Sequence, residues 1–546
     1  MRVLPWLLFA FASACFAQSS VREFENRDRS DSGPTVQGQF AAPDELAAPV
    51  AGQIRIKLTG FLFSGNHLVA TDALTAELRT YIGRELTARD LHSAARAVAH
   101  AYLRRGLMAR VRVTSVGKAE GVAEIAIEEL RVGKVHVEYP PYTRIREELV
   151  ERILTGGVVS GSPLPLAHLE NSIEVLNAQP GIAAAVGLDS SLRPGEVDVT
   201  VRLSDRPIFA GNAFVDNHGV REIGQERLGL NLRMNNALGF AEHFAIDTEE
   251  TAGSSLLSPL LSFPVGHEGM RASMQTTSAR FRAKRAGASL DLTGRFERWQ
   301  ATLRQTLMRG KPLTLRGEYA LQQTKYRDGS IFGTLQNRRI DTALFRLEGV
   351  ARSEVGITRV GLDIERGRAD LSRNSGDMST DTASSRIHGQ FWRLRWRLGH
   401  EISAVGNTLV LRANGQLADR NLDATQQFAL GGLDAVRAYP TAEALGDGGW
   451  LGTIEWRHRV DDSASAQLFL DHGGIQRNAR PWTNQRNRYE LSGLGAGLSW
   501  HLPERLRIKI EVARQLGGNA GRNVDGSDSD GRTSKWRGWL STQLEF

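Results

Sequence analysis

The residue patterns that usually mark enzyme active sites are missing from this 546-residue sequence. It contains no Gly-x-Ser-x-Gly nucleophile motif, no His-Glu-x-x-His zinc motif and no Gly-Lys-Ser/Thr phosphate-binding loop. None of the 13 histidines lies four or fewer positions from another, so local pairs of metal ligands are missing as well. The sequence therefore predicts no enzyme, no metal site and no cofactor.

One cation and one carboxylate stand out instead by their context. Arg437 lies in the run 427–450, which is rich in Gly and Ala and has no strand-like alternation. Such a run indicates a long, specifically shaped loop. Asp471 lies in a nearby alternating segment, 467–473. We expect the two charges to pair and to pin the loop to a strand, although an ordinary surface loop and a coincidental Asp are the plainer interpretation.

The alternation of side chains along the segment 466–473 predicts which face of the strand carries Asp471. Apolar side chains occupy every second position there, as in a strand with one apolar face. If that face contacts lipid, then Gln467, Phe469 and Asp471 face inward. By the same parity, three alternate glycines in 493–497 face inward. They either leave room for a packed loop or are weakly packed strand glycines.

The elements that position these residues begin near Pro207, where period-two alternation replaces helical patterning. Clear examples are the segments 227–234, 392–398 and 506–512. Their lengths approach the roughly 9–11 residues that cross a bilayer as a tilted strand. Aromatic residues recur near segment ends, as membrane girdles require. A soluble β-sandwich also alternates apolar with polar residues.

We favour the membrane barrel. Residues 207–546 supply about 16 antiparallel strands, at about 20 residues for each strand with its turn or loop. The last alternating segment, 536–546, ends on Phe546. A terminal aromatic on such a strand resembles the C-terminal signal by which outer-membrane barrels are recognised for assembly. After the N-terminus, no apolar run approaches the roughly 20 residues that a membrane helix needs.

The first 17 residues have the form of a secretory signal peptide, with a basic start, an apolar middle and small residues before Gln18. A lipoprotein signal with Cys15 as the lipidated residue is the alternative. Cys15 is the only cysteine, so the mature chain has no disulfide or thiolate site. Residues 18–52 are polar and are predicted to form a linker, with a short helix at 21–29.

Two α+β units are predicted between the linker and the barrel, over residues 53–132 and 133–206. Both show the order β-α-α-β-β, and the repetition at about 75 residues is informative in itself. In the first unit we expect strands at 54–58, 109–114 and 122–128, and helices at 72–81 and from an N-cap at Thr87 onward. In the second we expect strands at 135–139, 182–188 and 197–203, and helices at 144–154 and 166–176.

These features together resemble a known family. The sequences Val-Arg-Ala-Tyr at 436–439 and Phe-Leu-Asp-His-Gly at 469–473 are similar to the two barrel signatures of two-partner secretion transporters of the haemolysin secretion/activation type (TpsB). Ala438 stands where that family has Gly. The repeated α+β order, with Phe-Ser-Gly-Asn at 63–66, looks like POTRA domains. The resemblance assigns a loop-to-barrel interaction to Val436, Arg437, Tyr439, Phe469, Asp471 and Gly473.

The resemblance implies an outer-membrane translocator that exports a partner exoprotein, of the adhesin or haemolysin type, from the periplasm to the cell surface. POTRA-like domains would face the periplasm and contact the client, and a helix near the N-terminus can occupy the pore in this family. Further expected partners are outer-membrane lipid and the barrel assembly machinery. No nucleic acid is expected, because the Arg residues behind the net charge of +7 are spread through the alternating segments.

Three alternatives remain open at this point. An insertase that folds other barrels shares the architecture, although two POTRA-like units favour the exporter because insertases usually carry more. A passive porin would have no reason for the POTRA-like units. A secreted sandwich-type binding protein would be soluble without detergent.

Overall fold

The computed structural model describes most of the chain after the N-terminal segment. The predicted signal peptide, 1–17, and the polar segment 18–52 lie outside the described residues. The chain divides into two compact units: one ends at Arg206 and also takes in residues 236–241, and the other comprises 207–235 and 242–546. The described residues are 56–117, 121–154, 160–164, 166–266, 268–285, 287–310, 312–503 and 505–546.

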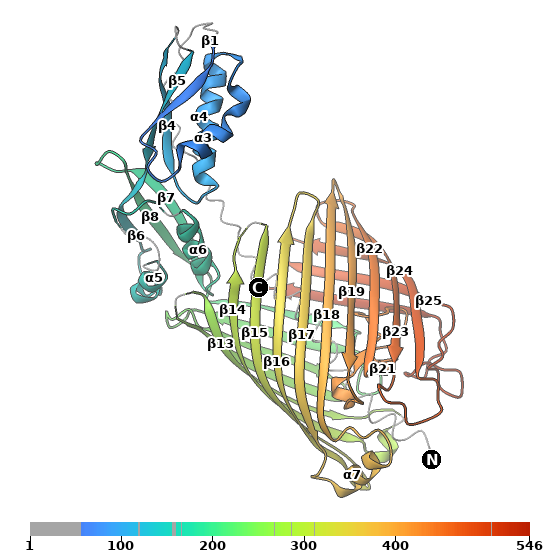
Figure 1. The fold of residues 1–546 in the computed structure, drawn as a ribbon. Coiled ribbons are helices and arrows are strands. Elements are labelled where there is room, and N and C mark those ends of the chain that lie inside the picture. Colours follow the sequence, from blue (N-terminus) through green and yellow to red (C-terminus); the bar gives the residue numbers. More distant parts are fainter. Residues whose placement is uncertain are drawn as a thin grey trace. The chain divides into compact units, whose positions relative to one another are not determined.

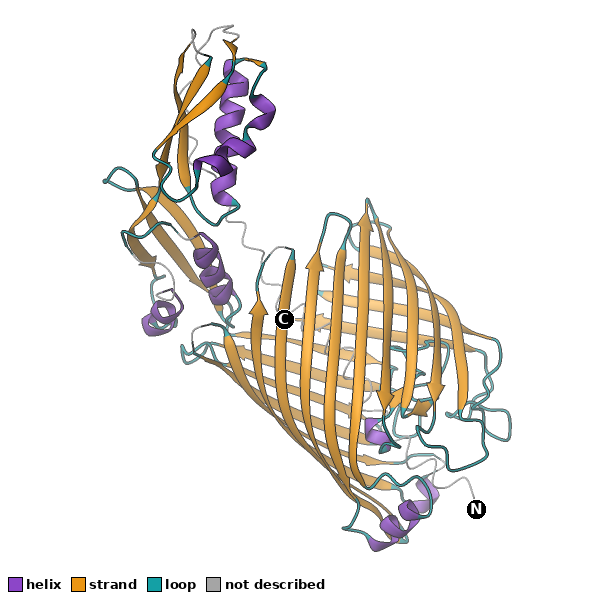
Figure 2. Ribbon diagram, in the orientation of Figure 1, coloured by secondary structure: helices purple, strands orange, loops and turns teal. Residues whose placement is uncertain are grey.

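The larger unit is a closed, 16-stranded antiparallel β-barrel, and this confirms the predicted fold class (Figures 1 and 2). Closure of the sheet excludes the open sandwich that alternation alone had allowed. The strands are β9 (Phe209–Asp216), β10 (Arg227–Asn235), β11 (His243–Thr251), β12 (Ser254–Val265), β13 (Met270–Arg282), β14 (Thr293–Met308), β15 (Leu313–Ser330), β16 (Gly333–Arg352), β17 (Ile357–Asp370), β18 (Gly389–Ala404), β19 (Asn407–Ala418), β22 (Gly448–Arg459), β23 (Ala464–Gln476), β24 (Arg488–Leu502), β25 (Leu506–Leu516) and β26 (Trp536–Glu545).

The two faces of the barrel have opposite chemistry. On β23, Leu468 and Leu470 are exposed on the outside, whereas Asp471 between β22 and β24 is fully buried on the inside. Apolar residues outside and polar residues inside are the pattern that a lipid-embedded barrel requires. The parity predicted from the sequence therefore holds for this strand.

No helix among the described residues is both long and apolar enough to span a bilayer.

Charged side chains on the inner face neutralise one another. Asp363 on β17 accepts hydrogen bonds from Arg346 on β16 (2.9 Å) and from Arg397 on β18 (2.8 Å). Arg395 also reaches this carboxylate, at 3.0 Å. Such bidentate pairs join three neighbouring strands across the wall and stiffen it against deformation.

The two ends of the barrel differ in the length of their connections. At one end the strands join through short turns such as 353–356 and 405–406. At the other end lie the long loops 371–388, 419–447 and 517–535. The loop 371–388 carries a helix, α7 (Ser375–Thr382), which the alternation of this region did not predict. Short periplasmic turns and long extracellular loops are typical of outer-membrane barrels.

The barrel closes where its last strand meets its first, and this seam is short. Only Ser541–Glu545 of β26 pairs in register with β9, whereas β15 and β16 pair along nearly their whole length. Beyond the register, Phe546 and Gly211 exchange two backbone hydrogen bonds of 3.0 Å. The terminal residue thus takes part in closure, and its half-exposed ring faces outward.

The smaller unit contains two three-stranded sheets with the same connectivity. Each sheet pairs its first strand parallel to its last, which lies in the centre, and its middle strand antiparallel on the other side. The second sheet comprises β6 (Arg131–Glu138), β7 (Ile182–Ser190) and β8 (Glu196–Asp205), with helices α5 (Glu147–Leu154) and α6 (Leu166–Asn177).

The first sheet differs from expectation at its first strand. The sheet comprises β2 (Gly60–Ser64), β4 (Ala109–Gly117) and β5 (Val122–Glu129). The described part of the segment predicted at 54–58 contains β1 (Ile56–Lys57), which pairs with β3 (Glu85–Leu86) and not with this sheet. The alternation of apolar and cationic residues at 54–58 favoured that segment, whereas 60–64 is a short apolar run that periodicity alone does not identify as a strand. The helices here are α3 (Thr71–Glu77), the 3-10 turn η1 (Arg79–Tyr81) and α4 (Ala88–Leu103).

The start of α4 follows from local chemistry. Thr87 accepts a hydrogen bond from the Asp90 amide, and the Asp90 carboxylate accepts one from the Thr87 amide (2.8 Å). This reciprocal capping box satisfies two backbone donors that a helix N-terminus leaves free. Hydrogen bonds from Thr87 lower the pKa of the exposed Asp90 carboxyl, so the cap is charged at neutral pH.

Candidate functional site

The loop 419–447 folds back into the barrel rather than away from it. It contains the 3-10 turn η3 (Ala424–Gln426) and a two-residue ladder between β20 (Phe428–Ala429) and β21 (Leu445–Gly446). Between these short strands Val436, Ala438 and Tyr439 are fully buried. The sequence run without alternation is therefore an ordered segment inside the barrel.

Arg437, near the tip of this loop, contacts the carboxylate that the sequence singled out. Its Nε and Nη2 donate to Asp471 Oδ2 (2.9 Å) and Oδ1 (2.8 Å) on β23. The Arg437 backbone amide donates to the same carboxylate at 3.1 Å. This bidentate geometry fixes both the side chain and the backbone of the loop tip.

Two further carboxylates bind the Arg437 guanidinium group. Arg437 Nη1 donates to Glu455 on β22 (2.8 Å) and to Glu511 on β25 (3.1 Å). Both glutamates are buried, and each keeps a second cation: Arg457 at 2.6 Å from Glu455, and Lys509 at 3.0 Å from Glu511. Asp471 has only Arg437 as a cationic partner among the ion pairs of the described residues. One loop cation thus joins three barrel strands.

An aromatic ring lies beneath the same guanidinium. The Arg437 carbon Cζ stands 3.3 Å from the centroid of the Phe469 ring, which faces inward from β23. A cation stacked on a buried ring gains electrostatic attraction in addition to its ion pairs. Opposite, Gly495 allows this ring to lie flat, since a Cβ there would come within 2.3 Å of it.

Glycines on the wall make room for the apolar part of the loop. A Cβ at Gly493 would lie 2.6 Å from the Ala438 Cβ, and one at Gly473 would lie 2.5 Å from Leu430. Val436 and Tyr439 belong to the buried cluster that fills this contact. Of the three inward glycines in 493–497, Gly493 therefore leaves space for the loop, whereas Gly495 and Gly497 lie against side chains of the barrel wall.

Ala438 has an ordinary backbone conformation. Positive φ angles in this loop occur at Gly432 (121°) and Ala442 (59°), and Ala438 is not among the residues with positive φ. The replacement of the family's Gly by Ala therefore causes no backbone strain here.

The loop also contacts both sides of the barrel seam. The Trp539 indole on β26 donates to the Arg437 carbonyl (2.8 Å), and Thr441 donates to the carbonyl of His218, just after β9 (3.2 Å). The rings of His218 and Trp539 meet edge to face at 5.8 Å. The loop tip is thus fixed to the short seam as well as to the neighbouring strands β22, β23 and β25.

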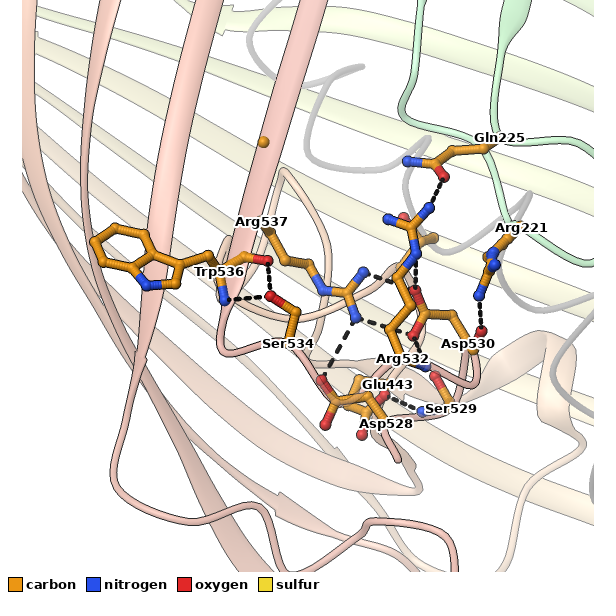
Figure 3. A network of polar contacts seen from close by, with 12 residues as sticks. Arg221, Gln225, Glu443, Asp528, Ser529, Asp530, Arg532, Ser534, Trp536 and Arg537 are labelled. Carbon is orange, nitrogen blue, oxygen red and sulfur yellow. Dashed lines mark hydrogen bonds and ion pairs between the residues drawn. The ribbon is translucent and has the colours of Figure 1, made fainter. Parts of the chain in front are cut away.

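A second loop, 517–535, holds the outer part of this segment (Figure 3). The buried Glu443 carboxylate accepts a hydrogen bond from the Ser529 amide (2.7 Å) and another from Asn519. Arg537, at the start of β26, pairs with Asp530 at 2.7 Å and with Asp528 at 3.4 Å. Burial raises the pKa of Glu443 to about 7.

A separate cluster anchors the start of the loop. Arg338 on β16 donates to Asp377 of α7 (2.6 Å) and to Asp423 (2.8 Å), and Tyr326 also bonds to Asp423. All four side chains are buried. One arginine of the wall therefore ties two long loops together.

The six residues predicted for the loop-to-barrel interaction lie in one place: Arg437 on Asp471 and Phe469, Val436 and Tyr439 in the cluster, and Gly473 against Leu430. Phe546 lies apart, at the short-turn end. Sequence reasoning assigned no role at this site to Glu455, Glu511 or Trp539. The register between strands, which one sequence does not provide, was needed to find them.

No cluster of three or more His, Cys, Asp or Glu side chains suited to a metal ion occurs in the described parts of the chain.

Comparison with protein families gives two matches. The model described as haemolysin secretion/activation protein ShlB/FhaC/HecB matches residues 195–500, more than half of the chain. The model of the ShlB-type POTRA domain matches residues 56–129. Among curated proteins, the heme/hemopexin transporter protein HuxB of Haemophilus influenzae (strain 86-028NP) is 24% identical over 522 residues, covering 93% of this chain and 90% of HuxB.

Solved structures share the fold. CdiB from Escherichia coli matches with a TM-score of 0.72 at 15% identity, over 98% of both chains. CdiB from Acinetobacter baumannii gives 0.67 at 13% identity, over 98% of this chain and 99% of that one. BamA from Haemophilus ducreyi lacking POTRA domains 1–3 gives 0.55 at 10% identity, over 90% and 100%.

Proposed function

The chain belongs to the haemolysin secretion/activation family ShlB/FhaC/HecB, and from this premise we propose how its barrel exports a partner exoprotein across the outer membrane. In the proposal, the loop 419–447 occupies the lumen at rest, and the Arg437 contacts hold it there. The observation that carries it is the seat of one buried loop cation on carboxylates of three strands. No enzymatic step is needed.

The proposal assigns separate tasks to the two units. The POTRA-like unit, in the periplasm, would receive the unfolded client, and the open edges of its small sheets can accept an added strand. The barrel, in the outer membrane, would pass the client to the surface. No nucleotide reaches this compartment, so folding of the client outside would have to drive export.

The nature of the client stays a proposal. The relatives are named for heme/hemopexin transport in HuxB, and the family for haemolysin secretion, so a large secreted protein of the adhesin or haemolysin type fits best. The insertase alternative shares the fold with BamA, but that likeness at 10% identity shows the fold alone. We further propose that the assembly machinery recognises the terminal strand ending at Phe546.

The loop assignment is tested by removing the cation. Arg437→Ala should impair secretion of the client while the barrel still inserts, and it should raise the ion conductance of the reconstituted barrel, because the loop is no longer held in the lumen. Lys509→Ala is the matched control: it also removes a cation from Glu511, but a partly exposed one that belongs to β25 and not to the loop.

The outcomes show whether the Arg437 contacts hold the loop in the pore. Reduced export with raised conductance in Arg437→Ala, and near-normal behaviour of Lys509→Ala, support the loop as the resting closure of the pore. Unchanged conductance and export in Arg437→Ala would show that the loop does not depend on this contact.

A further inference from the structure

Three arginines form a row on the outer face of the barrel, at the end that carries the long loops. Strand pairing places Arg280 on β13 directly opposite Arg295 on β14, and Arg295 directly opposite Arg327 on β15. All three side chains are exposed. They point away from the lumen, because their neighbours Phe296 and Tyr326 are buried in the cluster on the inside.

The positive charges of this row are not neutralised by carboxylates within the row. Like charges directly opposite one another on antiparallel strands repel and destabilise the sheet. Within the described residues, the side chains of Arg280 and Arg295 make no hydrogen bond or ion pair. Arg327 donates to the Thr334 hydroxyl at 2.7 Å, which leaves its charge unneutralised.

The adjacent outward positions do not supply the missing negative charge. Glu297, two residues from Arg295, offers one carboxylate to three guanidinium groups and faces Lys325 across the strands. Lys325 in turn faces Arg339, whose guanidinium pairs with Asp341 at 2.8 Å. The outer face of β13–β16 is therefore cationic at this level.

The row lies just beyond the apolar belt. Trp299, Leu321 and Met274 are exposed on the same strands, nearer the short-turn end. Trp299 follows Arg295 by four residues along β14, which is about 13 Å, or about 10 Å along the membrane normal for a tilted strand. Interfacial Trp residues stand where the apolar belt meets the headgroups, so the arginines, about 10 Å further out, lie at the level of the headgroups of the outer leaflet.

We propose that the row Arg280–Arg295–Arg327 binds the phosphate groups of a phosphorylated glycolipid of the outer leaflet. Guanidinium groups match phosphate oxygens with paired hydrogen bonds. A headgroup with two phosphates would bridge neighbouring members of the row and convert their mutual repulsion into attraction. The acyl chains would then lie along the apolar belt below. This site is independent of the export proposal, and its test involves no client.

The test measures lipid binding by the full-length protein in detergent. The triple variant Arg280→Gln, Arg295→Gln and Arg327→Gln is compared with the wild type for binding of bisphosphorylated lipid A and of its dephosphorylated form, with free inorganic phosphate as competitor. The wild type should bind the bisphosphorylated lipid at least about tenfold more tightly than the triple variant does, because several charge-assisted contacts are lost. Dephosphorylation should abolish the difference.

A matched control removes three exposed cations from the short-turn end: Arg352→Gln, Arg459→Gln and Arg505→Gln. It should bind the lipid as the wild type does. Equal binding by the wild type and the row variant would overturn the proposal. Effective competition by millimolar free phosphate would also overturn it, since it would mean that the row recognises soluble anions and not a lipid.

Thermal unfolding gives a second readout that a purely structural role would not produce. In lipid-free detergent the row variant should be at least as stable as the wild type, because repulsion is relieved. With bisphosphorylated lipid A, only the wild type and the control should gain stability. An equal gain by the row variant would contradict the proposal, and heat-modifiable migration on a gel shows that each variant is folded.

Discussion

The contact between Arg437 and Asp471 lends itself to a quantitative prediction. Replacing Arg437 by Ala leaves three buried carboxylates, but the loss is unequal among them. Glu455 keeps Arg457 and Glu511 keeps Lys509. Asp471 loses its cation and keeps only neutral donors, the Thr453 hydroxyl at 3.0 Å and the backbone amide of residue 437 at 3.1 Å. The main penalty therefore falls on Asp471.

Breaking a fully buried ion pair costs about 3–5 kcal/mol, and a wet lumen lowers this figure. We expect about 3 kcal/mol here, which corresponds to a change of about 150-fold in the equilibrium between the seated and the released loop. In a double-mutant cycle, Arg437→Ala with Asp471→Ala should show strong coupling, with the double variant little worse than either single one. Arg437→Ala with Glu455→Gln should couple more weakly.

The assay reports on the loop itself. Val436 is fully buried beside Arg437, and a smaller Cys at this position is a reporter of loop release. The only native cysteine, Cys15, lies within the predicted signal peptide. The rate of labelling by an aqueous thiol reagent should rise about 150-fold with Arg437→Ala. An unchanged rate, or purely additive effects of the Arg437 and Asp471 substitutions, would refute the reasoning.

Three other contacts give predictions of their own. Gly493→Ala should speed labelling of the same reporter and reduce export, because its Cβ would lie 2.6 Å from a loop methyl; Gly538→Ala, with open space around it, should not. Burial raises the pKa of Glu443 to about 7, and a carboxyl with a raised pKa stabilises the packed state only while protonated. Loop packing, measured as resistance to protease, should therefore weaken as the pH rises from about 4.5 through 7, and Glu443→Gln should remove this dependence. Thr87→Ala should cost the α+β unit about 1 kcal/mol in chemical unfolding, since the capping box is lost, and Thr87→Ser should cost little.

The fold was largely predictable because its signals are local. Alternation located the barrel, and the outward Leu468 and inward Asp471 show that parity is sufficient to assign faces. Capping chemistry at Thr87 located the start of α4 within one residue. Alternation could not reveal α7, a short helix in a loop whose Asp377 is held by the distant Arg338.

The site was predictable in part. Arg437 and Asp471 carry unusual local contexts, so sequence alone could pair them. Glu455 is one charged residue in an ordinary strand, and Trp539 is one of several strand aromatics. Their roles depend on strand register and on the depth to which the loop enters the barrel. Both are set by tertiary packing, which leaves no local pattern.

The position of the loop across the seam has a thermodynamic consequence. The segment that binds Asp471 also holds Trp539 on the last strand and, through Thr441, the residue that follows the first strand. Release of the loop from the lumen would therefore break contacts at both strands of the seam and weaken the pairing of β26 with β9. Because linkage is reciprocal, a client that spreads the seam would release the loop by the same amount. Opening of the lumen and separation of β26 from β9 are then coupled, so this barrel does not behave as a rigid ring.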